Sequence, residues 1–158
     1  VDALLRAGAP VDMFGVGTKP GVSADAPWSD MAYKLVSYDQ RPVMKLSTDK
    51  ISLPGAKQVF RFRDSAGQFS HDTIGLHDES MPGGTPLLTQ VMAGGRRTGP
   101  DPALGEIRQR FAEDFRGLDD HFKELDEPPH YPVSVSPRLE RLAAQVREEI
   151  LGAHPPAT

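Results

Sequence analysis

The sequence predicts a mixed α+β fold, in which one α/β unit is followed by antiparallel strands and then by helices. Three observations carry this prediction. Residues 1–31 combine a short helical segment with a glycine turn and an apolar stretch, residues 32–79 alternate as β-hairpins do, and residues 106–158 space their apolar side chains as helices do. Residues 80–105, which lie between them, hold four prolines and six glycines and predict a loop. A short strand over residues 87–92 within this loop is an open alternative.

Composition limits the class of protein. The chain has 158 residues, a formal charge of −4 and no cysteine. A mildly acidic balance argues against binding to nucleic acid. The lack of cysteine excludes disulfides and thiolate metal sites, and no apolar run approaches the roughly 18 residues of a membrane span. We therefore expect a cytoplasmic protein whose partners are neither nucleic acid nor membrane.

The first 31 residues predict the end of a helix followed by a strand. Residues 1–8 form the helical part, with Gly8 suited to cap its C-terminus. Residues 11–17 are mostly apolar and follow a tight turn, as buried strands of α/β proteins do. The chain opens on Val1 rather than Met, within this helical pattern, so we expect a piece cut from a longer protein.

Two β-hairpins are expected next. The first covers residues 33–47, with its turn at residues 39–42, and the second covers residues 58–76, with its turn at residues 64–67. Residues 53–57 form a further turn between them. A parallel-type unit that leads into an antiparallel sheet indicates a domain boundary or a crossing between domains.

The C-terminal part predicts two helices and a short extended segment. Apolar residues from Ile107 to Leu125 recur at steps of three or four, which predicts one amphipathic helix along that whole stretch. Residues 131–135 are expected to be extended. Ser136 followed by Pro137 has the pattern of a helix N-cap and first helical residue, so the last helix is expected to begin there.

A glycine-spaced turn is the strongest local signal for a ligand. In Gly15-Val16-Gly17-Thr18, which we call the glycine turn, the absent side chains leave backbone N–H groups accessible, and the Thr18 hydroxyl adds a donor. Such a turn at the C-terminal end of a strand suits a phosphate group. The alternative is a turn that binds nothing. The dinucleotide-binding fingerprint is absent, because it needs a third glycine and a helix directly after it.

A basic segment is the second candidate. It lies on the predicted hairpins and on the turn between them, and it could converge on a polyanion such as a diphosphate. The lysines are Lys34, Lys45, Lys50 and Lys57, with Ser47 between them, and we call Lys45, Ser47, Lys50 and Lys57 the basic segment. The alternative for this basic segment is a solvated face of the sheet.

Histidines and carboxylates near residue 71 are a weaker indication of a metal site. His71 and His77 are six residues apart on a predicted strand, which is about 20 Å at roughly 3.3 Å per residue and too far for one ion. We therefore expect them to be surface residues. No Ser-His-Asp or paired-carboxylate arrangement can be placed in one site, so neither a catalytic residue nor a metal ligand is assigned.

Several segments, taken in order, resemble the C-terminal part of nicotinate phosphoribosyltransferases. The similarity spans nearly the whole chain and is weakest across residues 80–126, where we expect the family to vary. The segments that carry it are residues 11–18, 23–27, 33–36, 43–47, 53–58 and 131–139.

This resemblance implies a type II phosphoribosyltransferase, in which an α/β barrel is joined to a sandwich-like domain. Residues 1–31 would be the final βα unit of the barrel, followed by the antiparallel hairpins of the second domain and two C-terminal helices. Members of the family join nicotinate to phosphoribosyl pyrophosphate, with ATP hydrolysis assisting, to give nicotinate mononucleotide for NAD biosynthesis. The resemblance also implies Mg²⁺ and ATP as cofactors of the complete enzyme, and a homodimer.

The resemblance also assigns roles to the two candidate sites. The glycine turn matches the strand-end motif that holds the ribose 5′-phosphate, and the basic segment matches a lysine-rich stretch that contacts pyrophosphate or nucleotide phosphates. The phosphorylated histidine, the nicotinate-stacking aromatic and the acidic contacts to ribose and Mg²⁺ are expected upstream, and none of the five histidines here matches the phosphorylated one. The 158 residues alone are therefore expected to be inactive, with an apolar surface around Leu4, Leu5, Phe14 and Val16 where the rest of the barrel would pack.

Two other functions stay open on the sequence. A phosphoribosyltransferase that uses nicotinamide would share these segments, because the residues that choose the substrate are not visible. A β-rich interaction module without activity would have a glycine turn that binds nothing, a native start at Val1 and a monomeric state.

Overall fold

The structure is a computed structural model that describes residues 1–153 apart from residues 16, 19–21, 23–32, 48–50 and 125. The chain divides into two compact units, Val1–Tyr33 and Lys34–Thr158. Each unit is described by itself.

The first unit begins with helix α1 (Asp2–Arg6). Gly8 follows it with φ +68°, and its N–H donates to the Leu5 carbonyl at 3.0 Å, while the N–H of Ala9 donates to the Leu4 carbonyl at 3.0 Å. Two such bonds closed by a left-handed glycine are a Schellman cap, which glycine adopts without a steric cost. The predicted cap at Gly8 is confirmed.

The strand predicted over residues 11–17 is wrong for the described part of this unit. Residues 11–15 and residue 17 carry no strand there, and Met13 is 86 % exposed. A buried α/β strand needs hydrogen-bonded neighbours on both sides, and no described residue of this unit supplies one. Leu4 and Leu5 are exposed and Phe14 is half-buried, whereas Val16 lies outside the described residues. The barrel unit therefore stays a prediction.

The first predicted hairpin forms in the second unit, but its strands are shorter and its turn covers residues 39–40 rather than 39–42. Strand β1 (Ser37–Tyr38) pairs antiparallel with β2 (Arg41–Pro42). Asp39 and Gln40 have φ of 47° and 59°, so the turn is of the type I′ kind that matches the twist of a two-residue hairpin.

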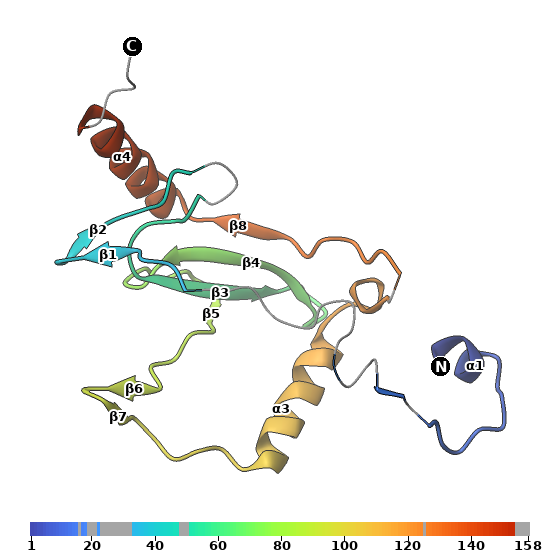
Figure 1. The fold of residues 1–158 in the computed structure, drawn as a ribbon. Helices are drawn as coiled ribbons and strands as arrows, with labels where there is room; N and C mark the ends of the chain where they lie inside the picture. Colours follow the sequence, from blue (N-terminus) through green and yellow to red (C-terminus); the bar gives the residue numbers. More distant parts are fainter. Residues whose placement is uncertain (16, 19–21, 23–32, 48–50, 125, 154–158) are drawn as a thin grey trace. The chain divides into compact units, whose positions relative to one another are not determined.

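The second predicted hairpin forms the centre of a four-stranded sheet. Strands β3 (Lys57–Arg63) and β4 (Phe69–Leu76) pair antiparallel. The sheet has the order β5-β3-β4-β8, in which β5 (Thr85–Pro86) is antiparallel to β3 and β8 (Val133–Val135) is parallel to β4 (Figure 1). The prediction of an antiparallel sheet thus holds except at the β8 edge.

The glycine- and proline-rich loop contains more structure than predicted. Besides β5 it holds a small hairpin of β6 (Met92–Ala93) and β7 (Arg96–Arg97), closed by Gly94 and Gly95. The strand left open at residues 87–92 overlaps β6 at one residue only. Short pieces of this kind carry too few alternating residues to be read from hydropathy.

The single helix predicted from Ile107 to Leu125 is wrong, because helix α3 (Leu104–Gly117) ends at Gly117 and a 3₁₀ turn, η1 (Asp120–Lys123), follows. Gly117 lies against the Phe69 ring, where an added Cβ would come 3.0 Å from the ring carbon Cζ. After it the backbone turns extended, and Asp119 caps the 3₁₀ turn by accepting from the N–H of His121 at 3.1 Å.

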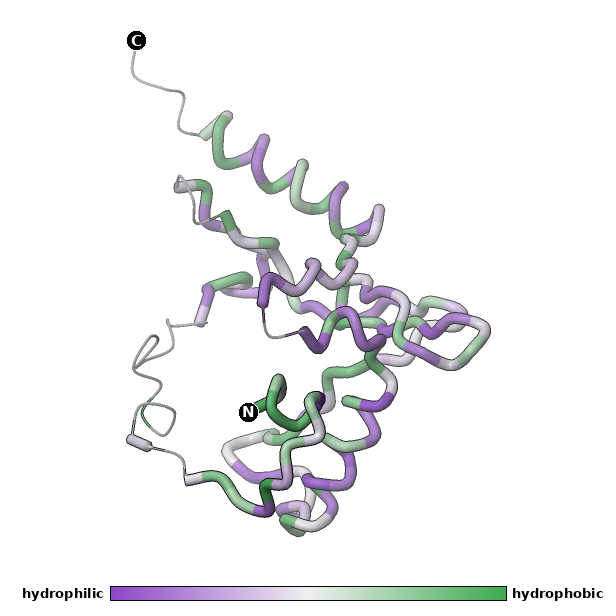
Figure 2. Tube along the Cα trace, turned by 90° about the vertical axis from the view of Figure 1, so that its right-hand side faces the viewer, coloured by the Kyte–Doolittle hydropathy of each residue, from purple (hydrophilic) through white to green (hydrophobic). Residues whose placement is uncertain are grey.

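The last helix, α4 (Pro137–Ala153), begins where the sequence predicts. Its N-cap Ser136 accepts from the N–H of Leu139 at 3.1 Å. Leu139 and Val146 of α4 join Phe60 and Phe69 of the sheet as the buried apolar residues. Figure 2 shows the alternation of hydrophobic and hydrophilic residues along this helix, which is the amphipathic pattern of a helix with one packed face.

A search of the described helices for a membrane span found none with the necessary length and apolar character.

Candidate functional site

The glycine turn lies open to solvent in the first unit. Gly15, Gly17 and Thr18 are exposed, and Val16 lies outside the described residues. A Cβ added at Gly15 or Gly17 would meet nothing within 4 Å, and neither residue has a positive φ. Within the described structure, therefore, neither packing nor backbone conformation requires glycine at these two positions.

Lys45 and Ser47 of the basic segment are exposed in the second unit. The loop that carries them is closed at its base, because the Lys45 N–H donates to Ser52 Oγ at 2.9 Å and the Ser52 N–H donates to the Lys45 carbonyl at 3.2 Å. Lys50 lies outside the described residues. The ammonium of Lys45 has no hydrogen bond within the described part of the chain, so it is available to an anion.

Lys57 is different, because its ammonium holds a turn. Nζ donates to the carbonyls of Leu53 at 2.8 Å and Gly55 at 2.7 Å. Burial lowers the pKa of Lys57. One of the three N–H groups of the Lys57 ammonium remains for a phosphate, and that contact stays a prediction.

A cluster that the sequence did not predict lies on strands β3 and β4. Arg61 and Asp72 face each other across the ladder and pair through two hydrogen bonds, Nε to Oδ1 at 3.0 Å and Nη2 to Oδ2 at 2.8 Å. Tyr131 donates its hydroxyl to Asp72 Oδ1 at 3.3 Å. The hydrogen bonds to Asp72 raise the pKa of Arg61. Burial is the main cause that raises the pKa of Tyr131, and the negative charge of Asp72 raises it further.

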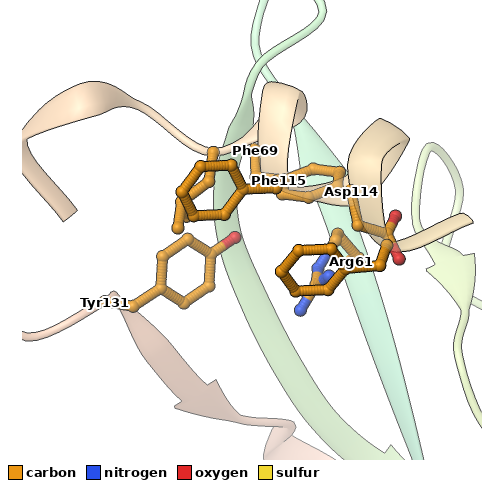
Figure 3. A pocket seen from close by; sticks show the side chains of 7 residues that line it. Arg61, Phe69, Asp114, Phe115 and Tyr131 are labelled. Atoms are coloured by element: carbon orange, nitrogen blue, oxygen red, sulfur yellow. The ribbon is translucent and has the colours of Figure 1, made fainter. Parts of the chain in front are cut away.

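Arg61 of this cluster lines a cavity of about 230 Å³ between α3 and the sheet (Figure 3). The Arg61 guanidinium carbon lies 4.5 Å from the centre of the Phe69 ring, in a cation–π contact. The remaining lining residues are Phe111, Asp114, Phe115, Leu118 and Tyr131. The cavity is mainly aromatic, and the charge of its arginine is already balanced by Asp72.

The histidines considered as metal ligands lie apart from one another. His71 stacks on Phe62 with ring centres 4.5 Å apart, and His77 is exposed. Asp72, from the same stretch, is committed to Arg61. Among the residues that the structure describes, no group of three or more His, Cys, Asp or Glu could hold a metal ion.

Comparison with known proteins places the chain among phosphoribosyltransferases. The sequence model of the nicotinate phosphoribosyltransferase C-terminal domain matches residues 84–143. Nicotinate phosphoribosyltransferase pncB2 of Mycobacterium tuberculosis is 42 % identical over 158 residues, covering 98 % of this chain and 34 % of its own length. The mouse nicotinate phosphoribosyltransferase is 31 % identical, with 88 % and 30 % covered.

The fold gives the same result. The crystal structure of human nicotinic acid phosphoribosyltransferase superposes with a TM-score of 0.64 and 27 % identity, covering 72 % of this chain and 26 % of the human one. Fold and matches together define a C-terminal region of a phosphoribosyltransferase. The chain belongs to the nicotinate phosphoribosyltransferase family, and it spans about a third of the length of the curated relatives it matches.

The resemblance found in the sequence is therefore confirmed. The family model matches residues 84–143, so most of the stretch 80–126, where we expect the similarity to be weakest, lies within the matched domain.

Proposed function

We propose that the chain is the C-terminal part of an enzyme that joins nicotinate to phosphoribosyl pyrophosphate, with ATP hydrolysis assisting, to form nicotinate mononucleotide in NAD biosynthesis. The ring nitrogen of nicotinate forms a bond to the ribose C1, and the bond from C1 to pyrophosphate breaks. The 42 % identity to pncB2 across 98 % of this chain carries the proposal.

In this proposal the glycine turn holds the ribose 5′-phosphate. The exposure of Gly15, Gly17 and Thr18, and the absence of any described neighbour that would require glycine, support that role. A phosphate dianion can accept hydrogen bonds from closely approached backbone N–H groups and from the Thr18 hydroxyl. Binding the phosphate end fixes the ribose, so that C1 is positioned for attack.

The basic segment would stabilise the departing pyrophosphate. Negative charge grows on the leaving group as the bond to C1 breaks, and nearby cations lower the energy of that transition state. Lys45, with its uncommitted ammonium, is the best placed described member, whereas Lys57 already gives two N–H groups to the turn. Among the described residues, no group of His, Asp or Glu side chains could hold the Mg²⁺ expected for the complete enzyme.

The further properties implied by the resemblance are part of the same proposal. They are a homodimeric assembly, a cytoplasmic location and the use of ATP by the complete enzyme.

A chimera tests this function. In the pncB2 chimera, residues 1–158 replace the matching third of the M. tuberculosis enzyme, and nicotinate mononucleotide is quantified by chromatography with and without ATP. We expect product formation that ATP accelerates. Thr18→Val should raise the KM for phosphoribosyl pyrophosphate about tenfold, since it removes one hydrogen bond to a charged group, while the exposed Thr89→Val should not. A folded chimera without product, or equal KM values for the two variants, would overturn the proposal.

A further inference from the structure

Helix α3 carries an apolar stripe that is mostly uncovered. The stripe residues follow one another at steps of three, four and four, so they lie along one face of the helix. Their exposed fractions are 82 % for Leu104, 40 % for Ile107, 67 % for Phe111 and 48 % for Phe115. Every residue from 85 to 116 is exposed. An isolated helix of this length is marginal in water, so we expect the stripe to be covered in the assembled protein.

Among the described residues, the contacts that hold the helix to the rest of the second unit lie in its C-terminal half. Gly117 lies against the Phe69 ring, and Lys123 Nζ stands 5.0 Å from the centre of the Phe115 ring. Toward the N-terminus, the described hydrogen bonds stay within the helix and its cap, such as the one from the Ala103 N–H to Glu106 at 2.8 Å. Figure 1 shows α3 leaving the sheet from its Gly117 end. The cavity lined by Phe111 and Phe115 lies at this junction.

We propose that the α3 stripe and the adjoining cavity form an interdomain surface, on which the part of the enzyme outside the matched third docks. The chain covers only 34 % of pncB2 and 26 % of the human chain, so about two thirds of such a polypeptide is available to cover the stripe. The inference rests on membership of the family and goes beyond the reaction proposed above.

The chemistry of the surface defines the docking segment. The cavity is lined by aromatic rings and holds about 230 Å³, which suits one large apolar side chain as an anchor. Asp72 neutralises Arg61 through two hydrogen bonds, and Asp114 adds a further carboxylate to the lining of the cavity, so an additional anion is disfavoured there. The docking segment is therefore an apolar face with one projecting aliphatic or aromatic residue, rather than an acidic peptide.

A second copy of the chain fits this surface less well. At 100° per residue, Arg108 flanks the stripe on one side and Asp114 on the other. In a two-fold antiparallel pair of α3 helices, each flank would meet the same flank of the other copy. Arg108 and Asp114 lie on opposite flanks, so they could not pair with each other across the two-fold axis, and the pair would lack that charge complementarity.

Photo-crosslinking in the pncB2 chimera identifies what covers the stripe. Benzoylphenylalanine in place of Phe111 keeps an aromatic side chain, and the matched control places it at Gln109, on the opposite face of α3. We expect crosslinks from position 111 to the pncB2-derived part within a single chain, and none from position 109. A product of doubled mass would assign the face to a second copy and overturn the proposal. A crosslink confined to residues 1–158 would overturn it too, and so would aggregation of the unsubstituted chimera.

Hydrogen exchange gives a second readout that does not depend on activity. We expect Phe111→Asp to speed exchange of the α3 amides about tenfold or more in the chimera, because covered helices exchange only after local opening. Gln109→Asp adds the same charge on the opposite face and should change exchange little. Fast exchange of these amides already in the unsubstituted chimera would overturn the proposal. Nicotinate mononucleotide formation is measured on the same samples, so an inactive chimera with crosslinks at position 111 would contradict only the proposed function.

Discussion

Ser136 and Glu79 join the start of α4 to the end of β4. The Ser136 hydroxyl donates to Glu79 Oε1 at 2.7 Å, and the same oxygen accepts from the backbone N–H of Leu76 at 2.7 Å. Ser136 is 1 % exposed, and its Oγ also accepts from the N–H of Leu139. One hydroxyl therefore caps the helix and fixes it to the sheet.

Removal of that hydroxyl should destabilise the second unit. Ser136→Ala loses the cap, which costs roughly 0.5–2 kcal/mol, and takes one donor from a partly buried carboxylate, which costs roughly 1–3 kcal/mol. We expect the free energy of unfolding to fall by about 1.5–5 kcal/mol, measured by urea unfolding followed by circular dichroism. Ser80→Ala, at an exposed position, is the control and should change it by less than about 0.5 kcal/mol. Equal values for the two variants would show that the hydroxyl contributes nothing.

Two glycines of α3 should respond in opposite ways to alanine. At Gly105 an added Cβ would meet nothing within 4 Å, whereas at Gly117 it would come 3.0 to 3.2 Å from the Phe69 ring. We expect Gly105→Ala to stabilise the chain by up to about 1 kcal/mol through helix propensity. Gly117→Ala should destabilise it, because a buried ring must move. Urea unfolding compares the two variants, and stabilisation by both would contradict the packing of Gly117.

Local rules made parts of the fold predictable. The cap at Gly8, the turn that begins at Asp39 and the helix start at Ser136 each depend on neighbouring residues. Each was found, although the turn predicted at residues 39–42 is confined to residues 39–40. The end of α3 was missed because the apolar spacing continues past Gly117. Contact with Phe69, distant in the sequence, fixes that glycine. The parallel pairing of β8 with β4 is also a long-range contact that no local pattern announces.

The residues of the candidate site were likewise only partly predictable from the sequence. The glycine turn and the basic segment could be proposed from composition and resemblance, and their roles stay predictions. The cluster of Arg61, Asp72 and Tyr131 could not be foreseen, because Tyr131 lies 59 residues from Asp72. Counting across the turn at residues 64–67 does not pair Arg61 with Asp72 either, because a register shift between Phe62 and Arg63 moves the partners along β4.

Stability should fall in acid through the ion pair of Asp78 and Arg138. Arg138 Nη2 donates to Asp78 Oδ2 at 2.7 Å, and this bond lowers the pKa of Asp78 from 3.8. Because the folded-state pKa lies below the unfolded value, the contribution is present above that value and is lost as the pH falls through the folded-state pKa.

The thermal midpoint of Asp78→Asn should therefore fall less than that of the parent between about pH 5 and about pH 3. Glu148→Gln is the control, since it removes an exposed carboxylate that has no hydrogen bond or ion pair in the described structure. Parallel pH profiles for the parent and Asp78→Asn would contradict the assignment.

The 158-residue chain alone should not form nicotinate mononucleotide. It spans about a third of its curated relatives, and the resemblance places the phosphorylated histidine and the nicotinate contacts outside it. We expect no product above background when the purified chain is incubated with nicotinate, phosphoribosyl pyrophosphate and ATP, while pncB2 serves as the positive control. Turnover by a preparation shown by mass spectrometry to contain only this chain would overturn the expectation.

We expect Lys45 to act in the reaction and Lys57 to stabilise the fold. In the pncB2 chimera, Lys45→Met removes an exposed ammonium that holds nothing in the described structure. It should therefore weaken phosphate-dependent kinetics, by about tenfold in kcat/KM for phosphoribosyl pyrophosphate, and leave the thermal midpoint unchanged. Lys57→Met removes the donor to the carbonyls of Leu53 and Gly55, so it should lower the thermal midpoint, because two partly buried acceptors lose their partner. Kinetics and thermal unfolding of both variants test this separation. A stable Lys57→Met with the larger kinetic defect would reverse the two roles and place the phosphate contact at the turn.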